Sequence, residues 1–199
     1  MKTPRRTRNS TQDALNFFAE AGLLKRVKRS GWWVAGIDEP ESVADHSFRT
    51  AVIGYYLAFC EGADPFKVVT MCLFNDIHEA RINDLHKMGH FYIDFKQAEE
   101  KVFQDQMRRL DQKVTAHLQS LRAEYTEQHS QASLLARDAD ILECLIQAKE
   151  YVDHGYLEAK RFFQKAPQHL QTASAKKMWA ALRKWESGQW WQNVVKFQR

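Results

Sequence analysis

Apolar residues recur every three or four positions along most of the chain, which is the spacing of helices with one buried face. The pattern predicts a first helix over residues 11–27, with Ser10 or Thr11 as its cap. A second helix is predicted over residues 42–59, with His46 near its start. Glycine and proline residues lie between the two segments and favour a loop there.

A third helix is expected over residues 64–77, because Asp followed by Pro is typical of an N-cap and a first helical residue. This helix is expected to carry Asn75, Asp76 and Glu79. The segment 81–94 has no clear periodicity, so we predict a loop that lies over a site.

The second half of the chain continues the helical spacing. It predicts one long helix over 98–125, another over 134–152, and two more over 156–165 and 174–187. The chain has only 8 glycines and 4 prolines, and the prolines fall between the periodic segments. The predicted fold class is therefore all-α, a compact bundle of six or more helices.

The charge of the chain is unevenly distributed. The 199 residues carry a formal charge of +4, and residues 1–10 contain four basic residues and no acidic one, so residues 11–199 are formally neutral. We expect a basic flexible tail over 1–10 and a single domain over 11–199. The absence of a basic surface from the rest of the sequence argues against a nucleic-acid partner, because phosphates require clustered Lys and Arg.

Cysteine usage and hydropathy give an expectation about the compartment. Cys60, Cys72 and Cys144 are too few and too widely spaced for a disulfide framework or a paired-cysteine zinc site. No stretch of the sequence approaches the roughly 18 consecutive apolar residues of a membrane span, and the N-terminus lacks the apolar run of a signal peptide. We therefore expect a cytoplasmic protein that neither spans a membrane nor is exported.

Polar residues interrupt the apolar stripes at a few positions. These are His46, Asn75, Asp76 and Asp140. Burying such groups costs free energy unless they are paired. Imidazole nitrogen and carboxylate oxygen together suit divalent first-row metals, and ligands from three helices would converge in the core of a bundle. From the residues alone, satisfied core polar groups and helix caps are the alternative to a metal site.

Three segments resemble the HD-domain metal-dependent phosphohydrolases, and within them the small 5'-deoxynucleotidases and their relatives. They read LLKRVKRSGWWVAGIDEPESVADHSFRTAVI, CLFNDIHEARINDL and ARDADILECLIQAKEY. The resemblance runs from about Leu15 to about Tyr151 and includes the order of the motifs and their separations. It implies a helical HD-domain fold.

The resemblance also implies a set of metal ligands. It places one divalent transition metal, which is Co, Mn, Fe, Ni or Zn, on His46, Asn75, Asp76 and Asp140. Asn75 stands where the family has His, and an amide oxygen is a weaker donor to such metals than imidazole. Three interpretations stay open: a weakened natural site, an inactive relative, and a deliberate substitution that traps a substrate complex.

Further site residues follow from the same resemblance. Glu79 and Asp84 match the acidic residues that orient the attacking water and handle protons for the leaving oxygen, with the division of roles open. Arg29 and Trp32 match the segment that reaches the substrate, where a guanidinium pairs with phosphate oxygens. From the residues alone, Asp84 is alternatively a turn cap and Arg29 part of a solvated basic face.

Other polar and aromatic residues have simpler explanations. Trp33 is expected in the core, and Asp138 is assigned to the surface or to a cap because it lies two residues before Asp140. Three histidines, His78, His86 and His90, invite a second metal, but scattered histidines in a loop are more often exposed.

The expected activity is hydrolysis of a nucleoside 5'-monophosphate, preferably a deoxyribonucleotide, to nucleoside and phosphate. The alternatives are a catalytically weakened or inactive nucleotide-binding protein and a phosphohydrolase of another small phosphorylated metabolite. A homodimer is also expected, from the long apolar helices, the Trp-rich C-terminus and the resemblance.

Overall fold

Helices make up nearly all of the regular structure in the computed structural model, which describes residues 10–194. The longer helices are α1 (Ser10–Ala21), α2 (Val43–Glu61), α3 (Pro65–Phe74), α6 (Phe95–Met107), α7 (Gln112–Glu127), α8 (Gln131–Asp153) and α10 (Ala173–Leu182). The shorter ones are α4 (Glu79–Ile82), α5 (Lys87–His90), α9 (Phe162–Lys165) and α11 (Gln189–Val194). Within residues 10–194 there is no β-strand, only one isolated bridge between Lys28 and Ser42. The prediction of an all-α bundle with six or more helices is confirmed.

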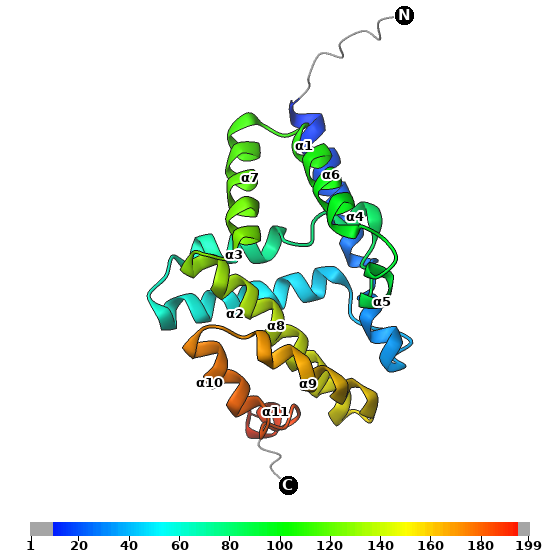
Figure 1. Cartoon of the computed structure of the whole chain (residues 1–199), viewed down its shortest axis with the longest axis vertical. Coiled ribbons are helices and arrows are strands. Elements are labelled where there is room, and N and C mark those ends of the chain that lie inside the picture. Colours follow the sequence, from blue (N-terminus) through cyan, green and yellow to red (C-terminus); the bar gives the residue numbers. More distant parts are fainter. Residues whose placement is uncertain (1–9, 195–199) are drawn as a thin grey trace, which may run out of the picture.

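The centre of the molecule is formed by α2, α3 and α8, with α2 packed against both of the others. In Figure 1, α1, α6 and α7 lie at the upper end of the molecule and α10 and α11 at the lower end. The largest apolar cluster joins the central helices to α7 and α10, with Leu57, Val68, Leu121, Leu142 and Leu182 among its members. None of the helices described between residues 10 and 194 is long and apolar enough to cross a membrane.

The ends of α2 and α3 follow local sequence rules. The Ser42 hydroxyl accepts a hydrogen bond from the Asp45 N–H at 3.1 Å, and the Asp45 carboxylate accepts one from the Ser42 N–H at 2.9 Å. This reciprocal capping box fixes the first turn of α2. Gly62, at φ 68°, ends the helix in the left-handed conformation that glycine tolerates best. Asp64 then caps α3, as the sequence predicts.

A glycine lets α2 and α3 approach each other closely. A Cβ atom at Gly54 would lie 2.8 Å from the Cys72 sulfur and 3.0 Å from Cγ1 of Val68. Both distances are below ordinary van der Waals contact, so a larger residue fits only if the Cys72 and Val68 side chains or one of the helices shift. The helix that carries His46 is thereby held against the helix that leads to Asp76.

Several predicted helix boundaries are wrong. The third helix ends at Phe74, so residues 75–78 form a turn and Glu79 begins a separate short helix, α4. The helix predicted over 98–125 is two helices, α6 and α7, because the chain turns at residues 108–111, where the Asp111 side chain caps α7. The segment 81–94 is predicted as a loop, but it contains the end of α4 and all of α5.

Smaller differences lie at the two ends of the described chain. The first helix ends at Ala21 and continues only as a 3-10 turn over Gly22–Lys25. Residues 156–165 form a 3-10 segment followed by α9, and α10 ends at Leu182, before the predicted 187. The predicted basic tail lies outside the described residues except for Ser10, where α1 begins. The single domain over 11–199 stays a prediction.

Asp138 is buried, so its assignment to the surface is wrong, and it is not itself a helix cap, because the N-cap of α10 is Thr172. Its carboxylate accepts hydrogen bonds from the N–H groups of Gln171 and Thr172 at 2.7 to 3.1 Å, and from the Thr172 hydroxyl at 2.7 Å. Since Thr172 is the N-cap of α10, this carboxylate ties the start of α10 to the middle of α8.

Candidate metal centre and active site

A cavity of about 700 Å³ lies where the central helices meet the segment around residue 30, the turn after α3, and α6. Seven of the eight site residues predicted from the sequence line it: Arg29, Trp32, Asn75, Asp76, Glu79, Asp84 and Asp140. The eighth, His46, is 1% exposed and contacts Asp140. Residues spread over more than one hundred positions of the sequence therefore meet around one cavity.

His46 and two carboxylates form the centre of this group. The Nε2 atom of His46 lies 3.0 Å from Oδ1 of Asp140 and 3.5 Å from Oδ2 of Asp76. The side-chain N–H of Asn75 donates to Oδ1 of Asp76 at 2.7 Å, a bond that does not use the amide oxygen of Asn75, which could bind a metal. The three elements that supply these side chains are the start of α2, the turn after α3 and the middle of α8.

This donor set fits a divalent first-row metal. The imidazole Nε2 of His46 lies within 3.5 Å of an oxygen of each of the two carboxylates, and such mixed nitrogen and oxygen sites suit Mn, Fe, Co, Ni or Zn. Within the described residues, the buried Oε2 atom of Glu79 beside these groups has no hydrogen-bond partner. A buried polar atom of this kind is usually satisfied by water or by a ligand. The predicted ligands Asn75, Asp76 and Asp140 can therefore serve with His46 as a metal centre.

Burial and Arg29 lower the pKa of His46, but Glu143 and Asp140 outweigh them and raise it to about 10. Burial opposes ionisation of Asp140, yet His46, Arg137 and Arg29 hold the pKa of Asp140 well below its usual range. Both shifts describe a cationic imidazole between anionic carboxylates. A metal cation would take the place of the proton on Nε2 in the same arrangement.

Glu41, His46 and Glu143 form a second group of potential ligands, with donor atoms within 4.8 Å of one another. Both oxygens of Glu143 and one oxygen of Glu41 already have partners. Glu41 accepts a hydrogen bond from the Trp32 indole at 3.0 Å, and Glu143 accepts one from Arg49 Nε at 2.9 Å. Because this group lies behind the cavity and the group around Asp76 faces it, the cavity group is the better candidate.

Arg29 and Asp84 are held together at the cavity edge. Arg29 donates from Nη1 to Asp84 Oδ2 at 3.1 Å, and the Ser30 hydroxyl donates to Asp84 Oδ1 at 2.9 Å. The backbone places Arg29 here because its N–H donates to the Glu41 carbonyl beside the bridge between residues 28 and 42. Arg29 is thus largely buried and paired, unlike a residue of a solvated basic face, and both Asp84 oxygens bind side chains rather than capping a turn.

Glu79 is the buried acid of the site. It is the first residue of α4 and lies on the cavity wall. Burial, together with the nearby charges of Asp76 and Asp84, raises the pKa of Glu79 well above its usual range. Such surroundings favour the protonated form of the carboxyl group, which is the form that can donate a proton.

The two tryptophans after Arg29 have opposite environments. Trp32 is 2% exposed, lines the cavity, and packs its ring 4.4 Å from Phe162 and 5.1 Å from Tyr151, measured between centroids. Trp33 is 52% exposed, so the expectation that it belongs to the core is wrong. Trp32 therefore forms a rigid wall of the cavity.

The histidines of the nearby loop have local roles. His86 accepts a hydrogen bond from the Gly89 N–H and caps α5, and His90 Nε2 lies 2.7 Å from the Leu85 carbonyl oxygen. His78 is buried with Nε2 3.6 Å from Glu99. All three line the cavity, where they contribute to the wall beside the candidate metal centre.

Sequence reasoning missed four charged residues around the site. Glu143 and Arg49 lie behind His46. Arg137 pairs with Asp140 Oδ2 at 3.1 Å, and Arg122 donates to the Asn75 carbonyl at 3.4 Å. A signal exists for Glu143 and Arg49, since each lies three residues after a predicted ligand and so shares its helix face. For Arg122 no comparable spacing exists.

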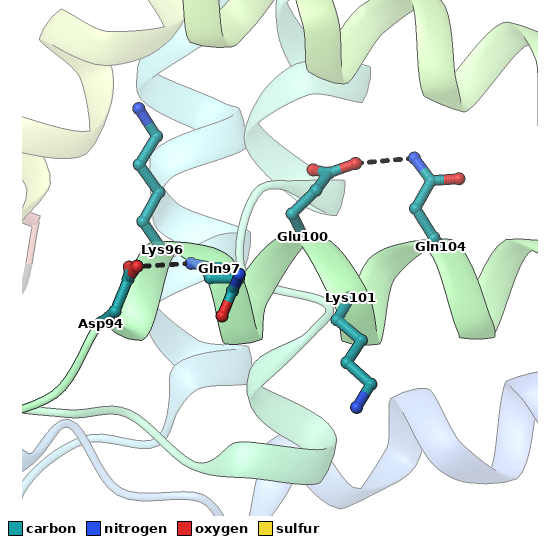
Figure 2. Close-up of a pocket in the computed structure, with 6 residues that line it drawn as sticks. All are labelled: Asp94, Lys96, Gln97, Glu100, Lys101 and Gln104. Carbon is teal, nitrogen blue, oxygen red and sulfur yellow. Dashed lines mark hydrogen bonds between the residues drawn. The ribbon is translucent and has the colours of Figure 1, made fainter.

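Figure 2 shows a different depression, an open hollow of about 750 Å³ along α6. Its six residues all come from α6 and the Asp94 that caps it, and they are paired locally: Asp94 accepts from the Gln97 N–H and Gln104 donates to Glu100. A hollow lined by a single helix does not bring together residues that are distant in the sequence. It is therefore a weaker candidate for the active site than the cavity beside His46.

The chain belongs to the HD domain family, whose model matches residues 21–181. Within it the chain is a 5'-deoxynucleotidase-like protein: it is 32% identical over 145 residues to the 5'-deoxynucleotidase HDDC2 of Dictyostelium discoideum, a match that covers 69% of this chain and 76% of that protein.

Solved structures share the fold. A conserved hypothetical protein from Pyrococcus furiosus is 29% identical with a TM-score of 0.75, and the match covers 86% of this chain and 99% of that one. A "predicted metal-dependent phosphohydrolase" from Magnetospirillum magnetotacticum has a TM-score of 0.70 at 21% identity, covering 88% and 90% of the two chains, and this likeness concerns the fold alone. The family and the donor set together indicate a divalent metal in this chain.

Proposed function

We propose that this chain is a metal-dependent phosphomonoesterase that hydrolyses deoxynucleoside 5'-monophosphates to nucleoside and phosphate. The observation that carries the proposal is the convergence of His46, Asp76 and Asp140 with an arginine and a buried acid around one cavity. The similarity to 5'-deoxynucleotidases supplies the substrate class.

Each residue has a role that its surroundings support. His46, Asn75, Asp76 and Asp140 would hold the metal. When bound, a divalent metal supplies Lewis-acid activation of water and offsets charge on the phosphoryl oxygens. These four side chains offer the metal one nitrogen and several oxygen ligand atoms.

The remaining residues bind the substrate, donate a proton to it, or hold and enclose the groups that do so. Arg29, fixed by Asp84, binds the phosphate oxygens through its fork of donors. Glu79 keeps a proton and delivers it to the leaving 5'-oxygen of the nucleoside, which departs as an alcohol. Asp84, with both oxygens bonded, is assigned to orienting Arg29. Trp32 bounds the site and limits access of bulk water.

A second candidate is a nucleotide-binding protein with little or no turnover. The observation that favours it is Asn75, whose side chain donates to Asp76 and whose oxygen is a weaker metal donor than imidazole. A third candidate is a phosphohydrolase of another small phosphorylated metabolite. In that case the cavity wall formed by His86, Lys87 and His90 would have to recognise a group other than a nucleoside.

The deciding experiment measures phosphate release from deoxyribonucleoside and ribonucleoside monophosphates, with added Co²⁺ or Mn²⁺, for this chain, Asn75→His and Asp76→Ala. Turnover by the first two and not by Asp76→Ala supports the proposal. Turnover by Asn75→His alone identifies this chain as a disabled nucleotidase. Unchanged turnover in Asp76→Ala contradicts the assigned metal centre.

A homodimer is the second part of the proposal, and the outer face of α2 supports it. Phe48, Val52, Tyr55 and Phe59 follow helical spacing and are each about half exposed or more, which forms an apolar stripe. Exposed apolar patches of this kind often mark contacts between proteins.

Cys60, Cys72 and Cys144 are all free thiols in the structure, which supports a reducing compartment such as the cytoplasm.

A further inference from the structure

Glu143 is a buried carboxylate behind the candidate metal centre, with no role in the proposed reaction. Its side chain is 0% exposed. One of its oxygens contacts Nδ1 of His46, and the other accepts a hydrogen bond from Arg49 Nε at 2.9 Å. Arg49 also donates to both oxygens of Glu150, at 2.9 and 2.8 Å, and to the side chain of Gln147. A buried charge is thus paired on both sides.

The two ring nitrogens of His46 face different partners. Nδ1 faces Glu143, and Nε2 faces Asp140 and Asp76 at 3.0 and 3.5 Å. In metal sites, a carboxylate that accepts the proton of one imidazole nitrogen fixes the ring orientation and leaves the lone pair of the other nitrogen for the metal. The geometry here has this arrangement, since the nitrogen that faces the other donors is the one remote from Glu143.

We propose that Glu143 is a positioning residue: it accepts the Nδ1–H of His46 and so directs Nε2 toward Asp76 and Asp140. Arg49 holds the carboxylate in place from the opposite side. The inference rests on the metal-binding part of the proposed function. In this arrangement Glu143 is not a metal ligand. The alternative arrangement is a metal held by Glu41, Glu143 and Nδ1 of His46.

The contacts favour the positioning role over the alternative ligand set. Both oxygens of Glu143 are already bonded, and Glu41 accepts the indole N–H of Trp32 at 3.0 Å. A metal among these groups would have to displace the Nδ1 proton, and it would lie against a guanidinium that already neutralises Glu143.

The first test reads the state of the ring directly. The chain is labelled with ¹⁵N-histidine and loaded with Zn²⁺, and long-range ¹H–¹⁵N NMR reports which nitrogen of His46 carries the proton; the signal is assigned by its loss in His46→Gln. The expected result is a protonated Nδ1 and a zinc-shifted Nε2. Zinc on Nδ1 would overturn the proposal. This measurement needs no variant of Glu143 and no turnover.

The second test compares Glu143→Gln with Glu150→Gln, a matched control that removes another carboxylate partner of Arg49 without touching His46. Zn²⁺ affinity is measured by competition with a chelating dye, and folding is checked by circular dichroism. We expect affinity to fall about 10- to 100-fold in Glu143→Gln and by less than about threefold in the control.

The outcomes separate this role from the proposed function. If Glu143→Gln keeps its zinc affinity, or if the two variants lose it equally, the role of Glu143 is wrong while the metal centre stands. If the unmodified chain binds no zinc, the metal centre itself is wrong and the role of Glu143 falls with it.

Discussion

Arg29 and Asp84, which are 55 residues apart in the chain, form an ion pair with 3.1 Å between Nη1 and Oδ2. The other oxygen of Asp84 accepts the Ser30 hydroxyl, so both oxygens of the carboxylate hold the segment that carries Arg29. This relationship suggests that Asp84 acts through the arginine. In contrast, the buried Glu79 has an oxygen without a hydrogen-bond partner among residues 10–194.

Replacing Asp84 by Asn should weaken substrate binding more than the chemical step. The neutral amide no longer anchors the guanidinium, so we expect KM for the nucleotide to rise about tenfold, which corresponds to about 1.4 kcal/mol, with a smaller change in kcat. Steady-state kinetics measure both. Ser30→Ala, which removes only the neutral donor, is the control and should change KM less. A loss confined to kcat would place Asp84 in the chemical step instead.

Replacing Asn75 by His should strengthen metal binding. Imidazole nitrogen is a better donor to first-row divalent metals than an amide oxygen, and we expect about a tenfold gain in Co²⁺ or Mn²⁺ affinity. Isothermal titration calorimetry measures it, with Asn75→Ala as the control expected to bind more weakly than the original chain. Equal affinities in all three proteins would show that the side chain at position 75 is not a ligand.

Metal affinity should rise with pH across the neutral range. Burial lowers the pKa of His46, but the acidic neighbours raise it to about 10, so in the metal-free protein the ring is cationic below that value. A metal must displace the Nε2 proton, and binding at pH 7 should release about one proton per site. Calorimetry in two buffers of different ionisation enthalpy counts the protons. Metal binding without proton release would contradict a cationic His46.

Replacing Asp138 by Ala should destabilise the fold without altering the metal centre. The substitution removes the charged acceptor of the partly buried hydrogen bonds from the N–H groups of Gln171 and Thr172, and a hydrogen bond to a charged group contributes about 1.5 to 3 kcal/mol. Urea unfolding should show a loss of about 3 kcal/mol. Asp153→Ala is the control, because Asp153 also accepts a backbone N–H, from Ser187, but is partly exposed. If Asp138→Ala is no less stable than the control, the carboxylate does not anchor α10.

Placing a charge on the apolar stripe of α2 should prevent dimer formation. Phe59 is 63% exposed in the single chain, and a Glu at this position would have to be desolvated in an isologous interface. Multi-angle light scattering at micromolar concentration should give a dimer for the original chain and a monomer for Phe59→Glu. Phe91→Glu, exposed on the segment after α5, is the control and should stay dimeric. A monomer for the unmodified chain would contradict the dimer.

Local rules explain which helix boundaries the sequence predicts correctly. The cap at Asp64 depends on residues within one turn of each other and is found where the sequence places it, and Ser42, at which the second predicted helix begins, is the N-cap of α2. The break between α6 and α7 was missed because the apolar spacing continues through the turn, where Leu110 is buried just as Met107 is. Asp111, a cap residue in the middle of the pattern, is the signal that could have found it.

Residue type and spacing mark His46, Asp76 and Asp140 as polar residues that interrupt apolar stripes, and the family resemblance is what implies that they bind a metal. The structure brings these three residues together. The contact of His46 with Glu143 spans 97 positions, and periodicity indicates that both are buried without indicating that they meet. The environments of Trp32 and Trp33 were beyond the pattern as well, because they lie in a 3-10 turn, whose faces the helical spacing does not describe.

The absence of a side chain at Gly54 contributes to the geometry of the candidate metal centre. It allows α2, which carries His46, to lie against Cys72 and Val68 of α3, the helix that leads to Asp76. A methyl group at this position would lie 2.8 Å from the Cys72 sulfur, so that side chain or one of the helices would have to shift. A residue outside the cavity, with no donor atom in its side chain, thus helps to hold together the two segments that supply His46 and Asp76.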